Sequence, residues 1–561
     1  MRHRRAKQRS QNSALESYLS AGPIYEPVSR VITVTAFKDT DSEALRKALA
    51  SLCSGLHQNN VLRHLTPANM ELAAAVVLFL CVGQLTVFGT WAADGLQARE
   101  DVAEEPEAGN DDEAAGQALF LTPLIKDGKL DEAKSKSKVG PLGADYEVPG
   151  YSGYITVNPQ YNSNLFFWFV PSLSDPDNAP VILWMQGGPG TTSMLGFFAE
   201  NGPYVLSADG SEIRYREINW ATRYSMLYVD QPVGTGFSFT ENEAGYARNQ
   251  TDVGRDMLEF LQQFFTLFGE LAGNELYLSG ESYAGKYVPT VGATLHQNAE
   301  TMRVKINFRG IAYGNGITDP IHMMDVGEVI YTVGLIDRSA ADYMMSVARE
   351  AVQHIRAGNT YEALMLMDTL FFGIATEGEV DTFFKNVTGY SYYYNYLTNT
   401  EPKGSRAYKV FLPKPRARRA LHVGDREFST TREVVVSHFL DDFMRSAVPQ
   451  FTEVLENGYK VLVYSGPLDL CVPTTMTENF LAHVAWAHVD RWAHAPTHQW
   501  WSADRQQLYG YKKTVENLNY VVVRNGGHEL PYDQPEAMME LITAFVDGTE
   551  PFVDGSATTD E

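Results

Sequence analysis

One stretch, residues 275–286, limits how this chain can fold more than any other. It reads as a short apolar strand, a sharp turn and the start of a helix, with Ser282 at the turn. Gly280 lies two positions before the serine, and Ala284 and Gly285 follow it. Small residues are needed here because larger side chains would collide where the strand and the helix approach each other. This is the layout of a nucleophile elbow, in which a strained turn presents a serine hydroxyl above a sheet.

Strand-like and helical segments alternate on both sides of this turn. An amphipathic helix is predicted at 252–268 and a last helix at about 535–545. Apolar strands are predicted at 164–170, 180–185, 226–230, 304–313, 460–464 and 518–523. Such alternation predicts an α/β fold with a mostly parallel central sheet that is covered by helices on both sides.

The alternation lapses between about residues 319 and 420. Helical stretches dominate there, at 325–331, 339–355 and 361–370, and a cluster of tyrosines follows between 390 and 396. We interpret this region as a helical cap inserted into the sheet domain. The predicted domains are the α/β core at 119–318 and 421–552, the cap insertion at 319–420, and a tail at 553–561.

Composition narrows the class of protein further. The chain has 561 residues, 44% of them hydrophobic, and a formal net charge of -24. It can therefore bury an ordinary core, and it lacks the basic character that nucleic-acid binding needs. Of its three cysteines, Cys53, Cys81 and Cys471, only the last lies in the globular part, so no disulfide framework is expected there. No metal-ligand spacing accompanies Cys471, and we expect no metal and no cofactor.

The chain before residue 119 predicts entry into the secretory pathway. An uncharged run at 72–93 resembles a secretory signal peptide that starts at Met70, with residues 1–69 as an extension whose translation is in doubt. The same run is long enough to span a bilayer, so a membrane is a partner only if it stays as a signal anchor. Residues 94–118 are acidic and predict a disordered linker.

A nucleophilic serine needs a base within hydrogen-bond reach, and the base needs a group that holds its tautomer. Asp469 follows the predicted strand at 460–464, and His528 follows the one at 518–523. Both should therefore lie at the sheet edge that carries Ser282. Other histidines lack this context, and we interpret them as surface or packing residues; these are His483, His488, His494 and His498.

Backbone N–H groups must stabilise the oxyanion that forms when the serine attacks. One donor is expected from Tyr283, the residue after the nucleophile. The other is expected from the glycine-rich loop at 186–190, which follows the predicted strand at 180–185. A plain Gly/Pro turn is the alternative for this loop, but beside a nucleophile elbow we favour the oxyanion role.

As a set, six motifs resemble those of the serine carboxypeptidases, over about residues 119–552. They are YSGY at 151–154, QGGPG at 186–190, ENGP at 200–203, DQPVGTGFS at 230–238, GESYAG at 280–285 and GGH at 526–528. Within that family the chain looks closest to the vitellogenic-like carboxypeptidases, which also carry glutamine at the position of Gln186. Most of the wider family has asparagine there, and a cysteine–serine pair at Thr191 and Thr192. These departures concern specificity rather than chemistry.

The resemblance implies an α/β-hydrolase fold with a catalytic triad. Ser282 would be the nucleophile, His528 the base and then the acid, and Asp469 the group that orients the histidine. Backbone N–H groups of Gly188 and Tyr283 would hold the oxyanion.

The resemblance also implies a site for the terminal carboxylate of the substrate, made by Gln186, Gly187, Glu200 and Glu281. Three carboxyl groups brought together cannot all be charged, so at least one of the two glutamates must hold a proton. We therefore expect peptidase activity that is strongest at acidic pH.

The leading hypothesis is a lysosomal or secreted enzyme that removes the C-terminal residue of peptides or proteins through an acyl-enzyme. Two alternatives stay open, an acyltransferase or esterase with the same nucleophile, and a binding glycoprotein in which catalysis is vestigial. Sequons at Asn249 and Asn386 are candidate glycosylation sites. The sequence leaves a homodimer open.

Overall fold

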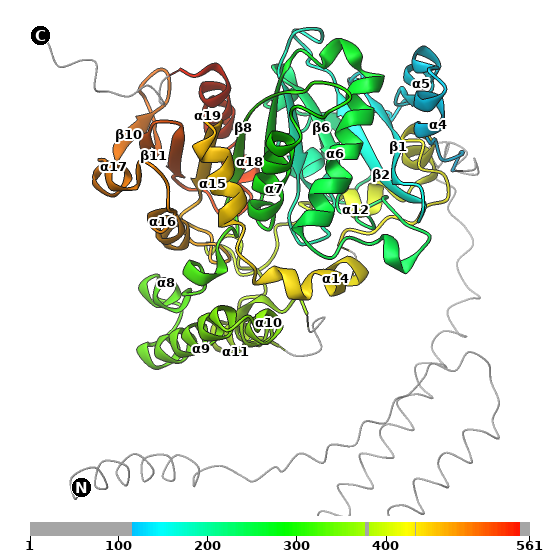
Figure 1. Cartoon of the computed structure of the whole chain (residues 1–561). Coiled ribbons are helices and arrows are strands. Elements are labelled where there is room, and N and C mark those ends of the chain that lie inside the picture. The colour runs from blue at the N-terminus through cyan, green and yellow to red at the C-terminus, as the bar shows by residue number, and fades with distance from the viewer. Residues whose placement is uncertain (1–114, 376–380, 432, 550–561) are drawn as a thin grey trace, which may run out of the picture. The chain divides into compact units, whose positions relative to one another are not determined.

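The computed structural model describes residues 115–375, 381–431 and 433–549, and everything said below of the structure concerns these residues. Ten strands form one mixed sheet in the order β1-β2-β6-β3-β7-β8-β9-β12-β11-β10 (Figure 1). They are β1 (Tyr151–Asn158), β2 (Ser163–Val170), β3 (Val181–Met185), β6 (Ser225–Val229), β7 (Glu275–Glu281), β8 (Asn307–Gly314), β9 (Lys460–Ser465), β10 (His498–Trp501), β11 (Leu508–Val515) and β12 (Leu518–Val523). A short separate hairpin joins β4 (Tyr204–Leu206) to β5 (Ile213–Tyr215).

The middle of the large sheet is parallel and its two margins are antiparallel. Neighbouring strands from β6 through β3, β7, β8 and β9 to β12 all run parallel. On one side β1 and β2 add antiparallel pairs, and on the other β11 and β10 do the same. The predicted α/β fold with a mostly parallel central sheet is therefore confirmed.

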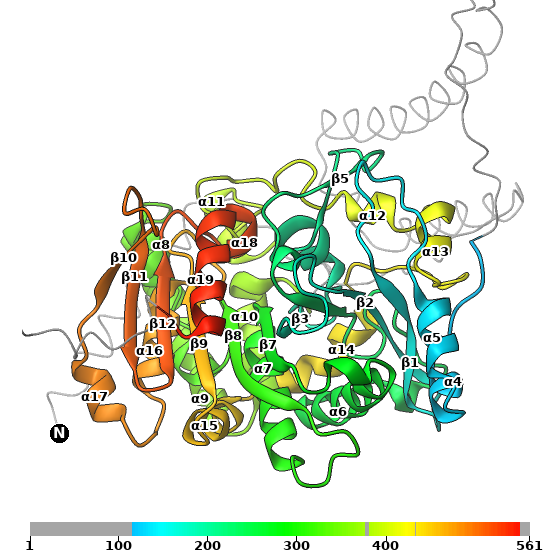
Figure 2. The same cartoon turned by 90° about the horizontal axis from the view of Figure 1, so that it is seen from above.

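Helices cover both faces of this sheet (Figure 2). On one face lie α4 (Thr122–Lys126), α5 (Leu130–Ser137), α6 (Gln250–Leu267), α7 (Ala284–Gln297) and α15 (Val448–Glu456). The other face is covered by α12 (Tyr408–Phe411), α13 (Pro415–Ala420), α18 (Leu530–Asp533) and α19 (Pro535–Asp547). Two further helices, α16 (Thr474–Ala482) and α17 (Val489–His494), connect β9 to β10.

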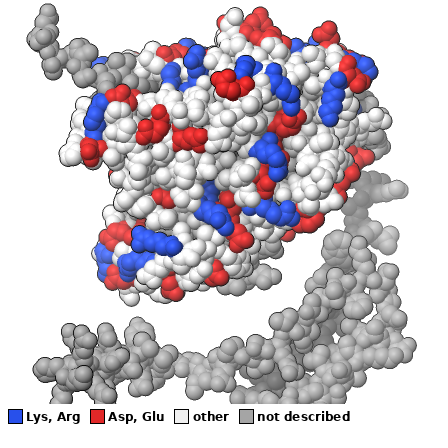
Figure 3. Space-filling model, viewed as in Figure 1, with Lys and Arg blue, Asp and Glu red and all other residues white. Residues whose placement is uncertain are grey.

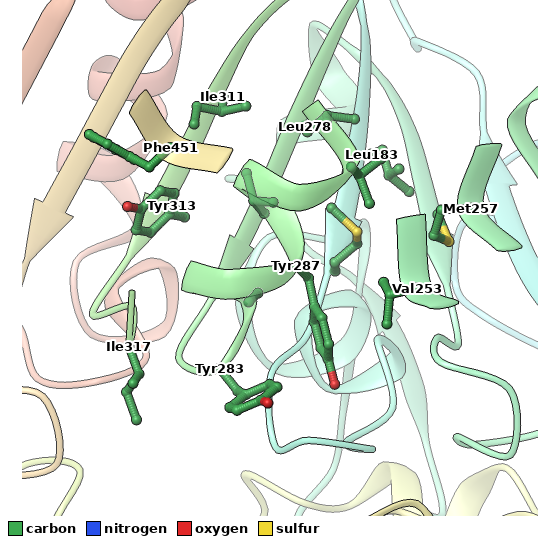
Figure 4. Close-up of a cluster of buried hydrophobic side chains, with 14 of the residues drawn as sticks. Leu183, Val253, Met257, Leu278, Tyr283, Tyr287, Ile311, Tyr313, Ile317 and Phe451 are labelled. Carbon is green, nitrogen blue, oxygen red and sulfur yellow. The ribbon is translucent and has the colours of Figure 1, made fainter. Parts of the chain in front are cut away.

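Central strands are buried on both faces, as parallel strands between two helical layers must be. In β3, Val181, Leu183 and Met185 belong to the core under α6 and α7. Its alternate residues, Ile182 and Trp184, belong to the core on the opposite face. Figure 4 shows the first of these cores, where side chains from the strands meet those of α6 and α7.

Between β8 and β9 the described chain forms helices joined by irregular segments, and it has no strand. It forms α8 (Gly327–Thr332), α9 (Arg338–Arg356), α10 (Thr360–Met367) and α11 (Phe383–Thr388), then α12 and α13, and then α14 (Glu433–Phe443). Helices α8 to α11 gather below the sheet in the view of Figure 1, and α14 packs on α10. The first three helices match those predicted, whereas the domain boundaries themselves stay predictions. The segments at 1–69, 70–93 and 553–561, and most of 94–118, lie outside the described residues.

On the face shown in Figure 3, acidic and basic side chains are interspersed. Among the helices that the structure describes, none is both long and apolar enough to cross a bilayer. The run at 72–93, which was predicted as a signal peptide or anchor, lies outside the described residues.

Candidate active site

The strand–turn–helix predicted at 275–286 is present, with β7 ending directly before Ser282 and α7 starting two residues after it. Ser282 has φ 65°, a left-handed conformation that costs energy for any residue with a Cβ. The close approach also explains the glycines. A Cβ on Gly280 would lie 2.4 Å from the carbonyl oxygen of Met185, and one on Gly285 would lie 2.7 Å from the backbone of Gly316.

The structure brings Asp469 and His528 together. The Nδ1 atom of His528 lies 2.7 Å from Oδ2 of Asp469, and both side chains are buried. The other ring nitrogen, Nε2, is buried and has no hydrogen-bond partner among the described residues. Burial lowers the pKa of His528, but the charge of Asp469 and its hydrogen bond outweigh burial, so the pKa is raised overall. This imidazole is therefore oriented at one nitrogen and open at the other.

Asn315 links the acid to the nucleophile turn. Ser282 donates its backbone N–H to the carbonyl of Gly314 at the end of β8, and the next residue, Asn315, donates from Nδ2 to Oδ2 of Asp469 over 2.7 Å. Backbone N–H groups of Cys471 and Val472 also donate to the Asp469 carboxylate. Sequence reasoning missed Asn315. Its φ is 44°, a conformation that asparagine is one of the few residue types to tolerate.

The glycine-rich loop after β3 packs directly on the turn. A Cβ on Gly187 would lie 2.5 Å from the backbone nitrogen of Tyr283 and 2.9 Å from Cβ of Ser282. Gly188 has φ 108°, a backbone conformation that is strained for a residue with a side chain, even where there is room for that side chain. The loop thus lies against the two residues that carry the expected nucleophile and one expected oxyanion donor.

Two buried glutamates lie beside this loop. Glu281 is the last residue of β7, and its Oε1 accepts a hydrogen bond from Nε2 of Gln186 over 2.9 Å. Burial, followed by the charge of Glu200, raises the pKa of Glu281 well above its ordinary value. Burial, followed by the charge of Glu529, raises the pKa of Glu200 to about 7. The electrostatics therefore favour at least one proton on the pair below neutral pH.

Comparisons with known proteins bear on this arrangement. The sequence profile described as serine carboxypeptidase matches residues 142–548. A venom serine carboxypeptidase of Apis mellifera is 42% identical over 77% of this chain and 92% of its own length. The chain belongs to the serine carboxypeptidase family. The family predicted from the sequence motifs is confirmed.

Other serine carboxypeptidases show the same likeness. The probable serine carboxypeptidase CPVL of Homo sapiens is 42% identical over 78% of this chain and 92% of its own length. The vitellogenic carboxypeptidase of Aedes aegypti is 38% identical over 77% of this chain and 90% of its own length. Among solved structures, Kex1(delta)p, a prohormone-processing carboxypeptidase from Saccharomyces cerevisiae, matches 74% of this chain and 96% of its own, with TM-score 0.64 and 20% identity. That likeness supports the α/β-hydrolase fold.

Two charged residues near the base were not anticipated. Glu529 follows His528 directly and is buried, and it forms a two-pronged ion pair with Arg406, with one nitrogen–oxygen distance of 3.1 Å. The same guanidinium contacts Glu401 at 2.9 Å through Nε. Glu529 could have been flagged by its place beside the histidine. Arg406 carries no such signal, because it lies in the irregular part of the insertion.

A buried polar cluster lies behind the nucleophile turn of this serine carboxypeptidase. The hydroxyl of Tyr283 and the amide of Gln250 both donate to Oδ2 of Asp442, over 2.7 Å and 2.6 Å. The ammonium group of Lys286 donates to the backbone carbonyls of Asp442 and Phe443. Burial lowers the pKa of Lys286 to about 8. Because Asp442 is on α14, the cluster ties the helix that packs on the insertion to the turn.

The other expected residues lie away from these groups. His483, His494 and His498 are exposed, in or beside α16, α17 and β10, and His488 is partly exposed. The sequon asparagines, Asn249 and Asn386, are exposed too. Within the described ranges, no cluster of three or more histidine, cysteine or acidic side chains is arranged to hold a metal ion.

Proposed function

We propose that this serine carboxypeptidase releases the C-terminal residue of peptides through an acyl-enzyme on Ser282. The Oγ atom attacks the carbonyl carbon of the last peptide bond, and its proton passes to Nε2 of His528. Asp469 holds the imidazole in the required tautomer and stabilises the imidazolium. The N–H groups of Gly188 and Tyr283 hold the oxyanion.

The tetrahedral intermediate then collapses and breaks the peptide bond. His528 returns the proton to the leaving amine, so the terminal amino acid departs and an ester to Ser282 remains. Water, deprotonated by the same imidazole, attacks the ester and releases the shortened peptide. In each half of the reaction, His528 therefore accepts one proton and gives it back.

The buried carboxyl pair supports exopeptidase specificity. Gln186, Gly187, Glu200 and Glu281 form the proposed site for the terminal carboxylate, next to the turn that carries Ser282. A protonated glutamate can donate a short, charge-assisted hydrogen bond to a carboxylate, whereas two ionised glutamates would repel it. The burial of both glutamates, with Glu281 bonded to Gln186, is the observation that carries this part of the proposal, and their raised pKa values support it.

We further propose a lysosomal or secreted location, with glycans at Asn249 and Asn386. Asn249 caps α6 through Oδ1, which accepts from the backbone of Asp252, so the amide nitrogen that a glycan would modify takes no part in this bond. Asn386 is exposed on α11. Mass spectrometry of the secreted protein before and after glycosidase treatment tests both sites.

A panel of blocked dipeptides and longer peptides with free or amidated C-termini, assayed from pH 4 to 8, tests the activity. We expect release of the terminal residue from free acids, weakening as pH rises above about 7, and little turnover of the amides. Turnover of esters or amides without turnover of free acids would instead indicate an esterase or acyltransferase. A folded protein whose Ser282 resists a fluorophosphonate probe would indicate that catalysis is vestigial.

A further inference from the structure

One segment of the insertion, residues 390–396, is joined to the loop that carries the expected acid. The backbone N–H of Tyr396 donates to the carbonyl of Leu468 over 3.0 Å. In return, Leu470 donates its N–H to the carbonyl of Tyr393, also over 3.0 Å. These two loop residues flank the acid on either side. The insertion therefore holds that loop from both directions.

The same segment also holds the base. The carbonyl of Tyr394 accepts the backbone N–H of His528 over 2.6 Å. The ring of Tyr394 stacks on the imidazole, with ring centroids 4.4 Å apart and planes inclined by 16°. Close approach depends on Gly527, because a Cβ there would lie 2.3 Å from the Tyr394 carbonyl oxygen.

We propose that Tyr394 is a positioning residue for the reaction, one that fixes the plane of the His528 imidazole and favours its charged form during proton transfer. A hydrogen bond to Asp469 restrains one atom of the imidazole, and a parallel aromatic ring restrains its plane. The negative face of the tyrosine ring attracts a cation above it. This inference rests on the proposed role of His528 as the base.

The charged groups around the imidazole of His528 act on its pKa separately from the ring of Tyr394. Asp469, Glu529 and Glu200 all raise the pKa of His528, and Arg406 pairs with Glu529. Burial raises the pKa of Tyr394 itself well above its ordinary value, so its ring stays neutral throughout the working range. Its contribution is therefore through the π face and through geometry, not through a charge.

The test compares Tyr394→Leu, which removes the ring, with Tyr394→Phe, which keeps it. Tyr392→Leu is the matched control, because this tyrosine is buried nearby and its ring meets Tyr394 edge-on at 5.4 Å, without stacking on the histidine. For Tyr394→Leu we expect kcat to fall about tenfold, with KM changed by less than about twofold. We also expect the acid limb of its kcat/KM profile to move to lower pH, because the imidazolium loses a stabilising contact.

Tyr394→Phe should keep the kcat and the acid limb of the parent, and Tyr392→Leu should lose thermal stability without moving that limb. A folded Tyr394→Leu protein with the parental kcat and acid limb would overturn the proposal. An equal loss of kcat in Tyr392→Leu would also overturn it, because the ring would then act only by packing. If the leucine variant does not fold, Tyr394→Met carries the same expectation. A parent that fails to cleave free-acid peptides would instead refute the proposed function.

Discussion

Gln186 donates a hydrogen bond from Nε2 to Oε1 of Glu281, over 2.9 Å, at the buried ends of two neighbouring strands. Its own Oε1 accepts from the indole N–H of Trp184, also over 2.9 Å, so the amide can face only one way. The glutamine thus spans the distance from an aromatic residue on one face of the sheet to the carboxyl pair. This arrangement gives a physical reason for glutamine at position 186, where most of the wider family has the shorter asparagine.

Shortening this amide should weaken substrate binding. Asparagine is one methylene shorter, so we expect Gln186→Asn to lose one of the two hydrogen bonds, to Trp184 or to Glu281. We expect KM for free-acid peptides to rise about tenfold, with kcat within about twofold of the parent. Gln262→Asn is the matched control, because the side-chain amide of this buried glutamine on α6 bonds to the backbone carbonyl and N–H of Val304. An unchanged KM in Gln186→Asn would contradict the assignment.

Activity should fall on the alkaline side as the carboxyl pair loses its proton. Burial raises the pKa of Glu200 to about 7, so the proton is held below that pH and lost as pH rises through it. We expect kcat/KM for free-acid peptides to decline by up to about tenfold per pH unit above 7. Glu281→Gln should make that decline shallower, because one of the two charges can no longer form. A parent profile that keeps rising to pH 9 would rule out this role for the pair.

On the acid side, the limit should come from His528. Asp469 raises the pKa of the imidazole, and the imidazole must be neutral to accept the serine proton, so activity is lost as pH falls through that pKa. Glu200 contributes to this raised pKa, and its protonation in acid removes that contribution. The same proton that completes the carboxylate site therefore helps to keep the base functional. Because of this coupling, we expect Glu200→Gln to move the acid limb of the kcat profile to lower pH. The profile is measured at substrate concentrations well above KM.

The carboxyl pair should also make the folded protein less stable as pH rises. The folded state binds a proton on Glu200 more tightly than the unfolded state does, because burial raises its pKa from 4.5 to about 7. The contribution of this proton to the free energy of unfolding is therefore fully present below about pH 4.5 and is lost as pH rises toward 7. We expect the urea midpoint of the parent to drop between pH 5 and 7 more than that of Glu200→Gln. The exposed Glu433 offers a control, since Glu433→Gln should follow the parent.

Breaking the ion pair between the insertion and the base loop should be costly. Arg406→Met leaves the buried Glu529 without its cation, and we expect a loss of about 3 kcal/mol in the free energy of unfolding. The double variant Arg406→Met with Glu529→Leu should recover much of that loss, because the unpaired charge is gone. Equal stabilities for the single and double variants would show that the pair is not coupled.

Much of the site could be predicted from the sequence because its parts are local. The nucleophile turn is specified by Ser282 and the small residues around it, and the acid and base each follow an apolar strand. Parallel neighbours then bring the strand ends to one edge of the sheet, as β9 and β12 do for Asp469 and His528.

The missed residues depend on long-range packing instead. Tyr394 and Arg406 lie in an irregular segment, and only the tertiary fold places them on the base and its neighbour. Strand β1 and the hairpin of β10 and β11 were not predicted either, because they form the margins of the sheet, where apolar periodicity is weaker. In β10, for example, only Trp500 is buried, while His498, Gln499 and Trp501 are exposed.

Labelling by a fluorophosphonate, read out by tandem mass spectrometry beside a peptidase assay, tests the central claim most directly. The account predicts a single modified serine, Ser282, complete loss of release of C-terminal residues on labelling, and a Ser282→Ala protein that folds but is at least about a thousandfold less active. Label on a different serine, or a Ser282→Ala protein that trims free-acid peptides at the parental rate, would contradict it.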